Sequence, residues 1–261
     1  MSKQKYKVGD IINNDKYGSY EILSNPGRDE KIRVRFLNTG FECEFHRAVI
    51  CYNRVKDYLF PSVYGIGYLG TPTLNDEDPL KLAITRLWMG LMSRCYDAQK
   101  LNARATYREC TVSEEWHNLQ NFKKWVILQI ESGYFQEGWE LDKDLLVRGN
   151  KVYGPNTCVF LPERLNQLQQ VKKDSQYNWL PGVNFDKSRG KFKSEVNFDG
   201  KRYYFPRRET ELESFLEYKE LKEKLVQADA ENWKGKIRPE AYQVLSNYSL
   251  DWVLEDYYKG T

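Results

Sequence analysis

The stretch Leu141-Asp-Lys-Asp-Leu145 is the part of this 261-residue sequence best suited to chemistry. Asp142 and Asp144 are separated by one residue, so on a β-strand both carboxylates would point to the same face. Such a pair can share a divalent cation through hard oxygen ligands. A cation held there would assist phosphodiester hydrolysis by stabilising the leaving oxygen, provided that a base activates water. From the spacing alone, the commoner interpretation of a solvated edge strand stays open.

The elements around these carboxylates follow the order strand, loop, strand, helix. Strands are predicted over 139–146 and 157–161, a turn at 148–151, and a polar helix after Pro162. When this unit folds on itself, it should bring three polar side chains near Asp142, namely those of Asn156, Thr157 and Asn166.

Two amphipathic helices are predicted before this unit. The first covers 81–97 and carries apolar residues at helical spacing: Ile84, Leu87, Trp88, Leu91 and Cys95. The second begins at Ser113 and ends by Gly133, with a stripe of Leu119, Phe122, Val126 and Ile130. We therefore expect the helices to flank a two-strand, one-helix core within one domain.

Six blocks between residues 83 and 170 resemble the HNH-type nuclease-like proteins of bacteriophages, which are related to the phage intron-homing endonucleases. In chain order they are 87–96, 110–116, 121–125, 141–144, 149–155 and 157–162, the last leading to Asn166. The resemblance implies a ββα-metal fold and a phage DNA-binding protein in the cytoplasm of the bacterial host. It also implies a metal-dependent DNA endonuclease, nicking or cutting both strands, with Mg²⁺ or Mn²⁺ as cofactor.

The resemblance assigns the functional residues of the family to positions of this chain. The metal-binding acid falls on Asp142, and the second ligand, an Asn or His on the final helix, falls on Asn166. Lys143 stands where active members have the general-base histidine, and Thr157 is near the position of the Asn that orients that base. A lysine with a pKa of about 10.4 is protonated at neutral pH, so Lys143 would act as a phosphate clamp or transition-state cation. Asp144 would be a substitute ligand or base.

The loss of that histidine leaves a rival hypothesis open, a catalytically inactive relative that only binds DNA. The sequence has two histidines, His46 and His117. His117 lies on the predicted second helix, where a surface or capping group is commoner than a displaced base. His46 belongs to Cys43-x-x-His46-x-x-x-x-Cys51, which has metal-like spacing but lacks a fourth ligand, so structural zinc is not expected. The five scattered cysteines are expected to be reduced thiols.

Residues 182–208 form a second candidate site, in which eight basic residues stand against three acidic ones. Such a local excess of positive charge is what attraction to phosphates requires. Three strands are predicted between Val183 and Phe205, with a hairpin at Asp199-Gly200. A charged helix should follow from about Glu209 to Gln227.

From Leu180 to about Gln227 the chain resembles the plant-type APETALA/ethylene-response-factor domain, through Gly182-Val183, 189–192, Gly200-Lys201 and the helix. It departs from that family at 205–210. The resemblance implies a three-stranded sheet in the major groove of double-stranded DNA, where arginine suits guanine and lysine neutralises phosphate. The predicted DNA-binding residues are Lys187, Arg189, Lys191, Lys193, Arg202 and Arg207. A merely solvated basic sheet is the alternative.

The N-terminal residues 1–70 predict a small antiparallel β-barrel. Alternation of Ile32, Val34 and Phe36 with arginines is typical of a half-buried strand. The stretches 55–58 and 61–70 are similar to the Tudor-like barrel of such phage proteins, which implies a docking module with a host protein as a further candidate partner. The arginines at 33, 35 and 47 would extend the DNA-binding surface.

The sequence therefore predicts an α+β protein in five segments: a β-barrel (1–70), a linker (71–80), an HNH-like nuclease domain (81–175), a three-stranded DNA-binding sheet with a helix (178–230) and a helical tail (231–261). No apolar run approaches the roughly 20 residues of a membrane span. The net charge of +3 does not indicate nucleic acid by itself. Oligomeric state and DNA target are not predicted.

Overall fold

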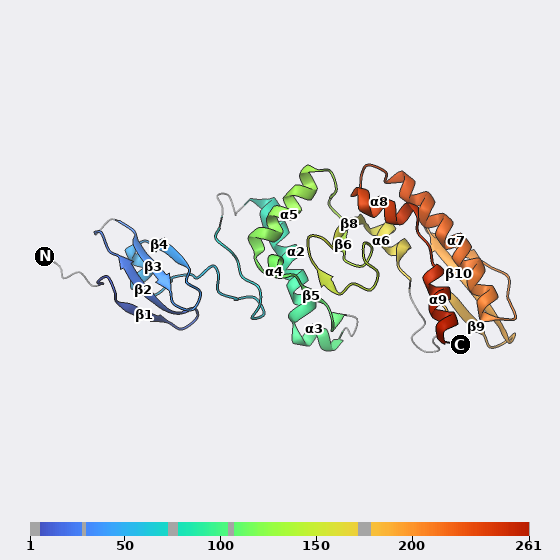
Figure 1. Ribbon diagram of the computed structural model, residues 1–261, viewed down its shortest axis with the longest axis horizontal. Helices are drawn as coiled ribbons and strands as arrows, with labels where there is room; N and C mark the ends of the chain where they lie inside the picture. Colours follow the sequence, from blue (N-terminus) through green and yellow to red (C-terminus); the bar gives the residue numbers. More distant parts are fainter. Residues whose placement is uncertain (1–5, 28–29, 73–77, 104–106, 172–178, 261) are drawn as a thin grey trace. The chain divides into compact units, whose positions relative to one another are not determined.

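The computed structural model describes residues 6–27, 30–72, 78–103, 107–171 and 179–260. The chain divides into two compact units, Met1–Val126 and Ile127–Thr261. The boundary falls inside helix α5 (Leu119–Glu131), which is labelled in Figure 1. Both units combine helices with antiparallel strands, which confirms the α+β class. Across the described ranges, no helix has the length and apolar character needed to cross a membrane.

The first unit opens with a four-stranded antiparallel sheet. Its strands follow each other in chain order: β1 (Ile11–Asn14), β2 (Gly18–Ser24), β3 (Ile32–Phe36) and β4 (Glu42–Phe45). The predicted alternation is confirmed, because Ile32, Val34 and Phe36 are fully buried. In the part of the chain that is described, β4 does not pair with β1, so the predicted barrel is not closed. After β4 the chain turns into helix α1 (Arg47–Cys51), which places Ile50 rather than another strand in this core.

Helices form the rest of the first unit. They are α2 (Pro79–Tyr96), α3 (Ala98–Ala103), α4 (Glu114–His117) and α5, with the short strand β5 (Thr111–Val112) between α3 and α4. The predicted core residues of α2 are buried, apart from Leu87, which is half-buried. The single helix predicted from Ser113 to Gly133 is wrong, because Asn118 adopts an extended backbone between α4 and α5. Its side chain accepts a hydrogen bond from the Gln120 backbone N–H at 2.9 Å and so caps the start of α5.

The second unit begins with the predicted strand–loop–strand–helix order. Strand β6 (Trp139–Asp142) pairs antiparallel with β8 (Val159–Pro162), and helix α6 (Glu163–Gln169) follows directly. The short strand β7 (Val152–Tyr153) lies in the loop between them. β6 ends at Asp142, four residues earlier than predicted.

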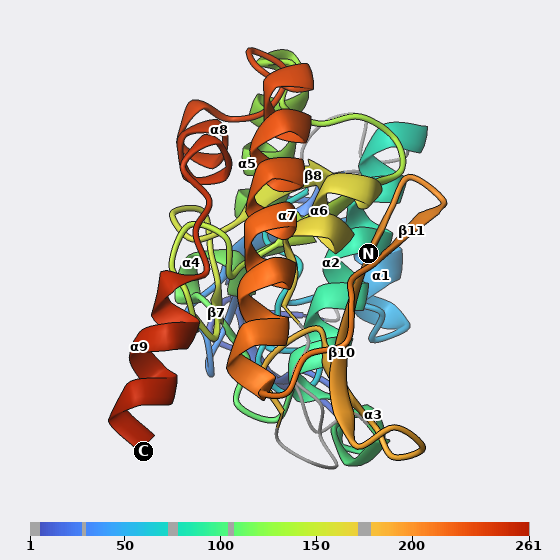
Figure 2. The same ribbon diagram turned by 90° about the vertical axis from the view of Figure 1, so that its right-hand side faces the viewer.

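A three-stranded antiparallel sheet follows, in the order β11-β10-β9. Its strands are β9 (Val183–Asp186), β10 (Lys191–Phe198) and β11 (Lys201–Tyr204). The predicted hairpin at Asp199-Gly200 is confirmed, and both residues have positive φ, 52° and 71°. Helix α7 (Glu211–Asn232) lies along β10 (Figure 2). It begins with a capping box between Thr210 and Glu213.

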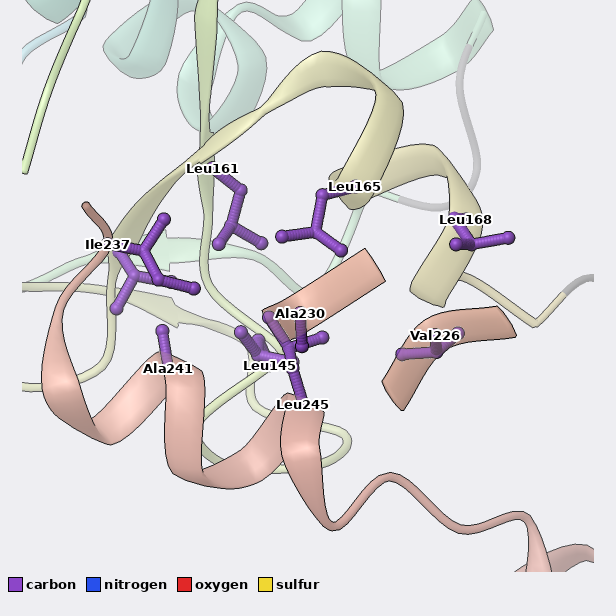
Figure 3. Packing of buried hydrophobic residues seen from close by; sticks show 10 residues of the cluster. Leu145, Leu161, Leu165, Leu168, Val226, Ala230, Ile237, Ala241 and Leu245 are labelled. Carbon is purple, nitrogen blue, oxygen red and sulfur yellow. The ribbon is translucent and has the colours of Figure 1, made fainter. Parts of the chain in front are cut away.

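Helix α7 takes part in two hydrophobic cores of the second unit. Its first half contributes Phe215 and Tyr218 to the core beneath the sheet. Its second half contributes Val226 and Ala230 to a core built with residues of β8, α6 and helix α8 (Pro239–Ser246) (Figure 3). The C-terminal tail thus has two helices, α8 and α9 (Asp251–Gly260), where one was expected. Helix α7 therefore packs against both the three-stranded sheet and α6, the elements that carry the two candidate sites.

Candidate functional sites

Asp142 lies at the end of β6 with 8% of its surface exposed. Its Oδ1 accepts hydrogen bonds from the backbone N–H groups of Asp144, at 2.8 Å, and Leu145, at 2.7 Å. Burial raises the pKa of this carboxyl above its usual value, although these two hydrogen bonds act in the opposite direction. Asp142 is therefore a fixed acceptor, and its other oxygen is directed to α6.

Two side-chain amides of α6 complete the surroundings of Asp142. Gln169 Nε2 lies 3.4 Å from Asp142 Oδ2 and 3.2 Å from Asn166 Oδ1. Asn166 Nδ2 donates to a carboxylate oxygen of Glu140 at 2.7 Å. The structure therefore brings Asp142 and Asn166 together, with Gln169 joining them.

Sequence reasoning missed both Glu140 and Gln169. Glu140 precedes Asp142 by two residues on β6, and Gln169 follows Asn166 by three on α6, so each shares a face with its neighbour. This spacing was readable in the sequence. That the two faces meet depends on the pairing of β6 with β8 and on the packing of α6, which spacing does not reveal.

Asp144 is not part of the strand. Because β6 ends at Asp142, the prediction that both carboxylates share a strand face is wrong. Asp144 instead forms an ion pair with Lys143, and its side chain is 52% exposed whereas that of Lys143 is 11% exposed. Lys143 Nζ also lies 5.7 Å from the centre of the Tyr153 ring. Lys143 thus donates to a carboxylate, which is the reverse of what a general base must do.

Thr157 belongs to the loop and not to the Asp142 cluster. Its hydroxyl donates to the backbone oxygens of Val152, at 2.7 Å, and Gly154, at 3.3 Å. The loop is also braced by Asn150, whose Nδ2 donates to the Lys143 backbone oxygen at 2.8 Å. Thr157 is therefore held in a structural role, and the neighbouring Asn156 is exposed.

His117 and Cys158 have hydrogen-bond partners outside the Asp142 cluster. His117 belongs to the first unit, where its Nε2 lies 3.0 Å from the Val112 backbone oxygen. All five cysteines are free thiols. Cys158 is buried, and burial raises its pKa to about 12, so it carries a neutral thiol at neutral pH. Among the residues that the structure describes, no three His, Cys, Asp or Glu side chains group as a metal site.

The three-stranded sheet has one face on α7 and one face toward solvent. Ser194 and Val196 are buried, and the Ser194 hydroxyl donates to the Ser214 backbone oxygen of α7 at 2.8 Å. Successive residues of β10 alternate between the faces, and directly paired residues of neighbouring strands share a face. The register therefore places these side chains on the solvent face: Asn184, Asp186, Lys191, Lys193, Glu195, Asn197, Arg202 and Tyr204.

The six predicted DNA-binding residues are all at least partly exposed, but their partners differ. Lys187 and Arg189 lie in the β9–β10 turn. Ion pairs engage three others, since Lys191 pairs with Glu209 at 2.6 Å, Arg207 with Asp186 at 2.8 Å and Arg202 with Glu195 at 3.8 Å. The charges of Lys191 and Arg207 are therefore partly neutralised within the chain.

Arg202 is held by a hydrogen bond as well as by this ion pair. Its Nε donates to Asn197 Oδ1 at 3.1 Å and lies 3.8 Å from a Glu195 oxygen. Lys193 and Arg189 differ from these paired residues. Within the described ranges, neither side chain has a hydrogen-bond or ion-pair partner. The solvent face thus offers unpaired positive charge at Lys193 and a guanidinium with a fixed Nε at Arg202.

The arginines of the N-terminal sheet do not offer such charge. Arg33 and Arg35 both pair with Glu42, at 2.7 and 2.8 Å. The hydrogen bond from Arg35 is the largest of the causes that lower the pKa of the Glu42 carboxyl. Arg47 donates to Asn25 Oδ1 and to the Gly27 backbone oxygen. All three guanidinium groups are engaged within their own unit.

Comparison with known proteins gave no match to this chain among family models, curated proteins or solved structures. The geometry of the two clusters in the second unit is therefore the basis for a functional proposal.

Proposed function

We propose that this protein binds double-stranded DNA through the solvent face of β9, β10 and β11. The observation that carries the proposal is the register of the sheet, which groups Lys191, Lys193 and Arg202 on the face opposite α7. Lysine and arginine supply the phosphate attraction on which DNA affinity depends. Because α7 occupies the other face, the strands present these groups outward on a rigid support.

The neutral residues of this face suit the same role. Asn184 stands directly opposite Lys193, and Asn197 directly opposite Arg202. Side-chain amides are both donors and acceptors and can pair with base edges, whereas charged groups mainly position the protein on the backbone. Tyr204, 70% exposed, adds an aromatic surface. A narrow antiparallel ribbon of this kind fits the major groove, which is about 12 Å wide.

The proposal is tested by fluorescence anisotropy with a labelled duplex in EDTA over a range of salt concentrations. The double variant Lys193→Ala/Arg202→Ala should bind more weakly, and the slope of log affinity against log salt should fall by about 0.9 for each phosphate that is no longer neutralised. Lys224→Ala is the matched control, because Lys224 is an exposed lysine of α7 paired with Glu220. Equal affinity of the double variant and the control would refute the proposal.

A metal-dependent DNA endonuclease is the second candidate function, and the proximity of Asp142 and Asn166 favours it. Their oxygens are hard donors of the kind that Mg²⁺ and Mn²⁺ take, so the residues present fit such an ion. A bound ion would supply charge stabilisation at a phosphodiester. The resemblance to phage HNH-type proteins supports this candidate, whereas the engagement of Lys143 with Asp144 favours the inactive DNA-binding relative.

Supercoiled plasmid distinguishes the two candidates. An endonuclease should convert it to nicked or linear DNA with Mg²⁺ or Mn²⁺ and leave it intact with EDTA. Asp142→Ala should abolish the cleavage and retain DNA binding through the sheet. Glu163→Ala, at the exposed start of α6, is the control for preparation and folding. Cleavage by Asp142→Ala at the parental rate would exclude Asp142 as a metal ligand.

A further inference from the structure

We propose that Gln169 is the third oxygen ligand of a divalent-cation site whose other ligands are Asp142 and Asn166. The inference rests on the second candidate function, the metal-dependent endonuclease, only in assuming that a divalent cation binds near Asp142. It requires neither DNA binding nor hydrolysis, and it assigns a residue that the resemblance does not assign.

The orientation of Asn166 is fixed from one side. Its Nδ2 donates to Glu140 at 2.7 Å, and an amide that donates on one side presents its oxygen on the other. Asn166 is 6% exposed, so this arrangement is sheltered from water. Asn166 Oδ1 lies 3.2 Å from Gln169 Nε2 and so faces Gln169.

Asp142 is fixed in a similar way. Its Oδ1 is engaged by two backbone N–H groups, which leaves Oδ2 as the oxygen available to a partner. The nearest cationic side chain in sequence, Lys143, is paired with Asp144. Asp142 Oδ2 instead faces the Gln169 amide at 3.4 Å.

The two distances from Gln169 to the other proposed ligands are close to those between neighbouring ligands of one octahedral cation. The Gln169 terminal nitrogen is 3.4 Å from Asp142 Oδ2 and 3.2 Å from Asn166 Oδ1. In an octahedron with metal–oxygen distances of about 2.1 Å, neighbouring ligand atoms are about 3.0 Å apart. A small movement of the Gln169 side chain would therefore bring its terminal atom to this spacing from both oxygens.

Gln169 can change its role without moving the helix. Without a cation, its Nε2 donates to both oxygens; a half-turn of the terminal amide exchanges Nε2 for Oε1 and converts the donor into a ligand. The Gln169 backbone oxygen accepts a hydrogen bond from the Tyr248 hydroxyl at 2.8 Å, which holds the end of α6 in place. Gln169 is also more exposed than Asp142 or Asn166, so it lies on the side from which a cation would enter.

Titration of the full-length protein with Mn²⁺ alone, followed by the electron paramagnetic resonance of free Mn²⁺, tests the inference. The parent should bind one ion. Gln169→Ala should bind it roughly tenfold or more weakly, an effect at least as large as that of removing an outer-shell partner of a metal site. Gln169→Glu should bind it more tightly, because it adds a carboxylate. Gln167→Ala is the control, since Gln167 is exposed on the same helix and donates to Glu163.

A second measurement covers the case in which a variant does not fold. In the parent, Mg²⁺ should shift the side-chain amide resonances of Gln169 in a ¹⁵N spectrum and leave those of Gln167 unchanged. The inference is wrong if the parent binds no Mn²⁺, if Gln169→Ala binds it as tightly as the parent, or if the Gln169 amide does not respond to Mg²⁺. DNA binding through the sheet is measured in EDTA, so its failure would be recognised separately.

Discussion

The four-stranded N-terminal sheet and the three-stranded C-terminal sheet both carry basic residues on a solvent face, yet their charges are arranged differently. In the N-terminal sheet, Arg35 stands directly opposite Glu42, and Glu42 also binds Arg33. In the C-terminal sheet, Lys193 stands opposite the neutral Asn184. Lys191 stands opposite Asp186, and Arg202, opposite Asn197, also lies 3.8 Å from a Glu195 oxygen. Opposite charges placed across two strands stabilise the sheet, whereas a neutral neighbour leaves the positive charge available to a ligand.

The number of basic residues in a strand therefore does not identify a nucleic-acid surface. Both sheets have basic residues at alternating positions, and the neutral cross-strand partner of Lys193 distinguishes the C-terminal sheet. Register is the property that distinguishes an internally neutralised face from one suited to phosphate. Substitutions that change these partners should affect stability and DNA binding to different degrees.

Arg164 provides the extreme case of a charge held by an internal partner. It binds Asp229, which is 2% exposed and whose Oδ2 is buried without a hydrogen-bond partner. Arg164→Ala should lower the free energy of unfolding by about 2 to 3 kcal/mol, because it leaves a buried carboxylate unpaired. Urea denaturation measures the loss.

Arg148→Ala is the matched control, because Arg148 and Asp256 form a pair in which both side chains are more than half exposed. Arg148→Ala should lower the free energy of unfolding by less than about 1 kcal/mol. If both variants lost the same stability, the Arg164 pair would be no more important than a surface contact.

Asn184→Glu should give the C-terminal sheet the arrangement of the N-terminal one. A carboxylate directly opposite Lys193 would neutralise it as Glu42 neutralises Arg35. We expect duplex affinity to fall roughly tenfold, about 1.4 kcal/mol, and the salt slope to fall by about 0.9. Anisotropy titration measures both, and Asn184→Gln, which keeps the amide, should leave the slope unchanged. An unchanged affinity would show that Lys193 does not meet DNA.

The reciprocal change is Glu42→Gln, which releases Arg33 and Arg35 in the N-terminal sheet. Duplex affinity should rise by roughly twofold, through added phosphate attraction. The same titration detects it, and Glu44→Gln is the control, because Glu44 lies on the same strand and face. A gain as large as the loss in Asn184→Glu would mean that the two sheets are equivalent DNA-binding surfaces.

Replacing Asp142 by Asn should give the smallest of these effects, a change in the free energy of unfolding that depends on pH. Burial raises the pKa of Asp142 in the folded state, so the stability it contributes is present below its usual pKa and is lost as pH rises through the folded value. In EDTA, the parent should therefore lose stability relative to Asp142→Asn as pH rises from acid toward neutral. Urea denaturation at several pH values measures this difference. The opposite trend would show that the charged carboxylate is stabilised by its surroundings.

Features that depend on local spacing could be predicted from the sequence. The alternation in β3 and the Asp199-Gly200 hairpin needed only neighbouring residues, because side-chain direction and turn conformation are set within a few residues. The same applies to the strand–loop–strand–helix order around Asp142. The resemblances named the residues of the candidate site but not how they contact each other.

Features that depend on tertiary pairing could not be predicted. The break at Asn118 arises from pairing with Tyr68, whose backbone N–H and C=O bond to His117 and Leu119 on either side of the break. The shared use of α7 by two cores, and the meeting of Gln169 with Asp142, require elements that are distant in sequence to pack together. Local periodicity contains no information on such contacts.

DNA binding by the solvent face of β9–β11 can be followed residue by residue through the amide and side-chain resonances of the ¹⁵N-labelled protein, titrated with duplex DNA in EDTA. Binding by this face should give the largest shifts at Asn184, Lys193, Asn197, Arg202 and Tyr204, with Arg33 and Arg35 unaffected. Shifts centred on the N-terminal sheet, or no shifts at a saturating DNA concentration, would show that the face does not bind DNA.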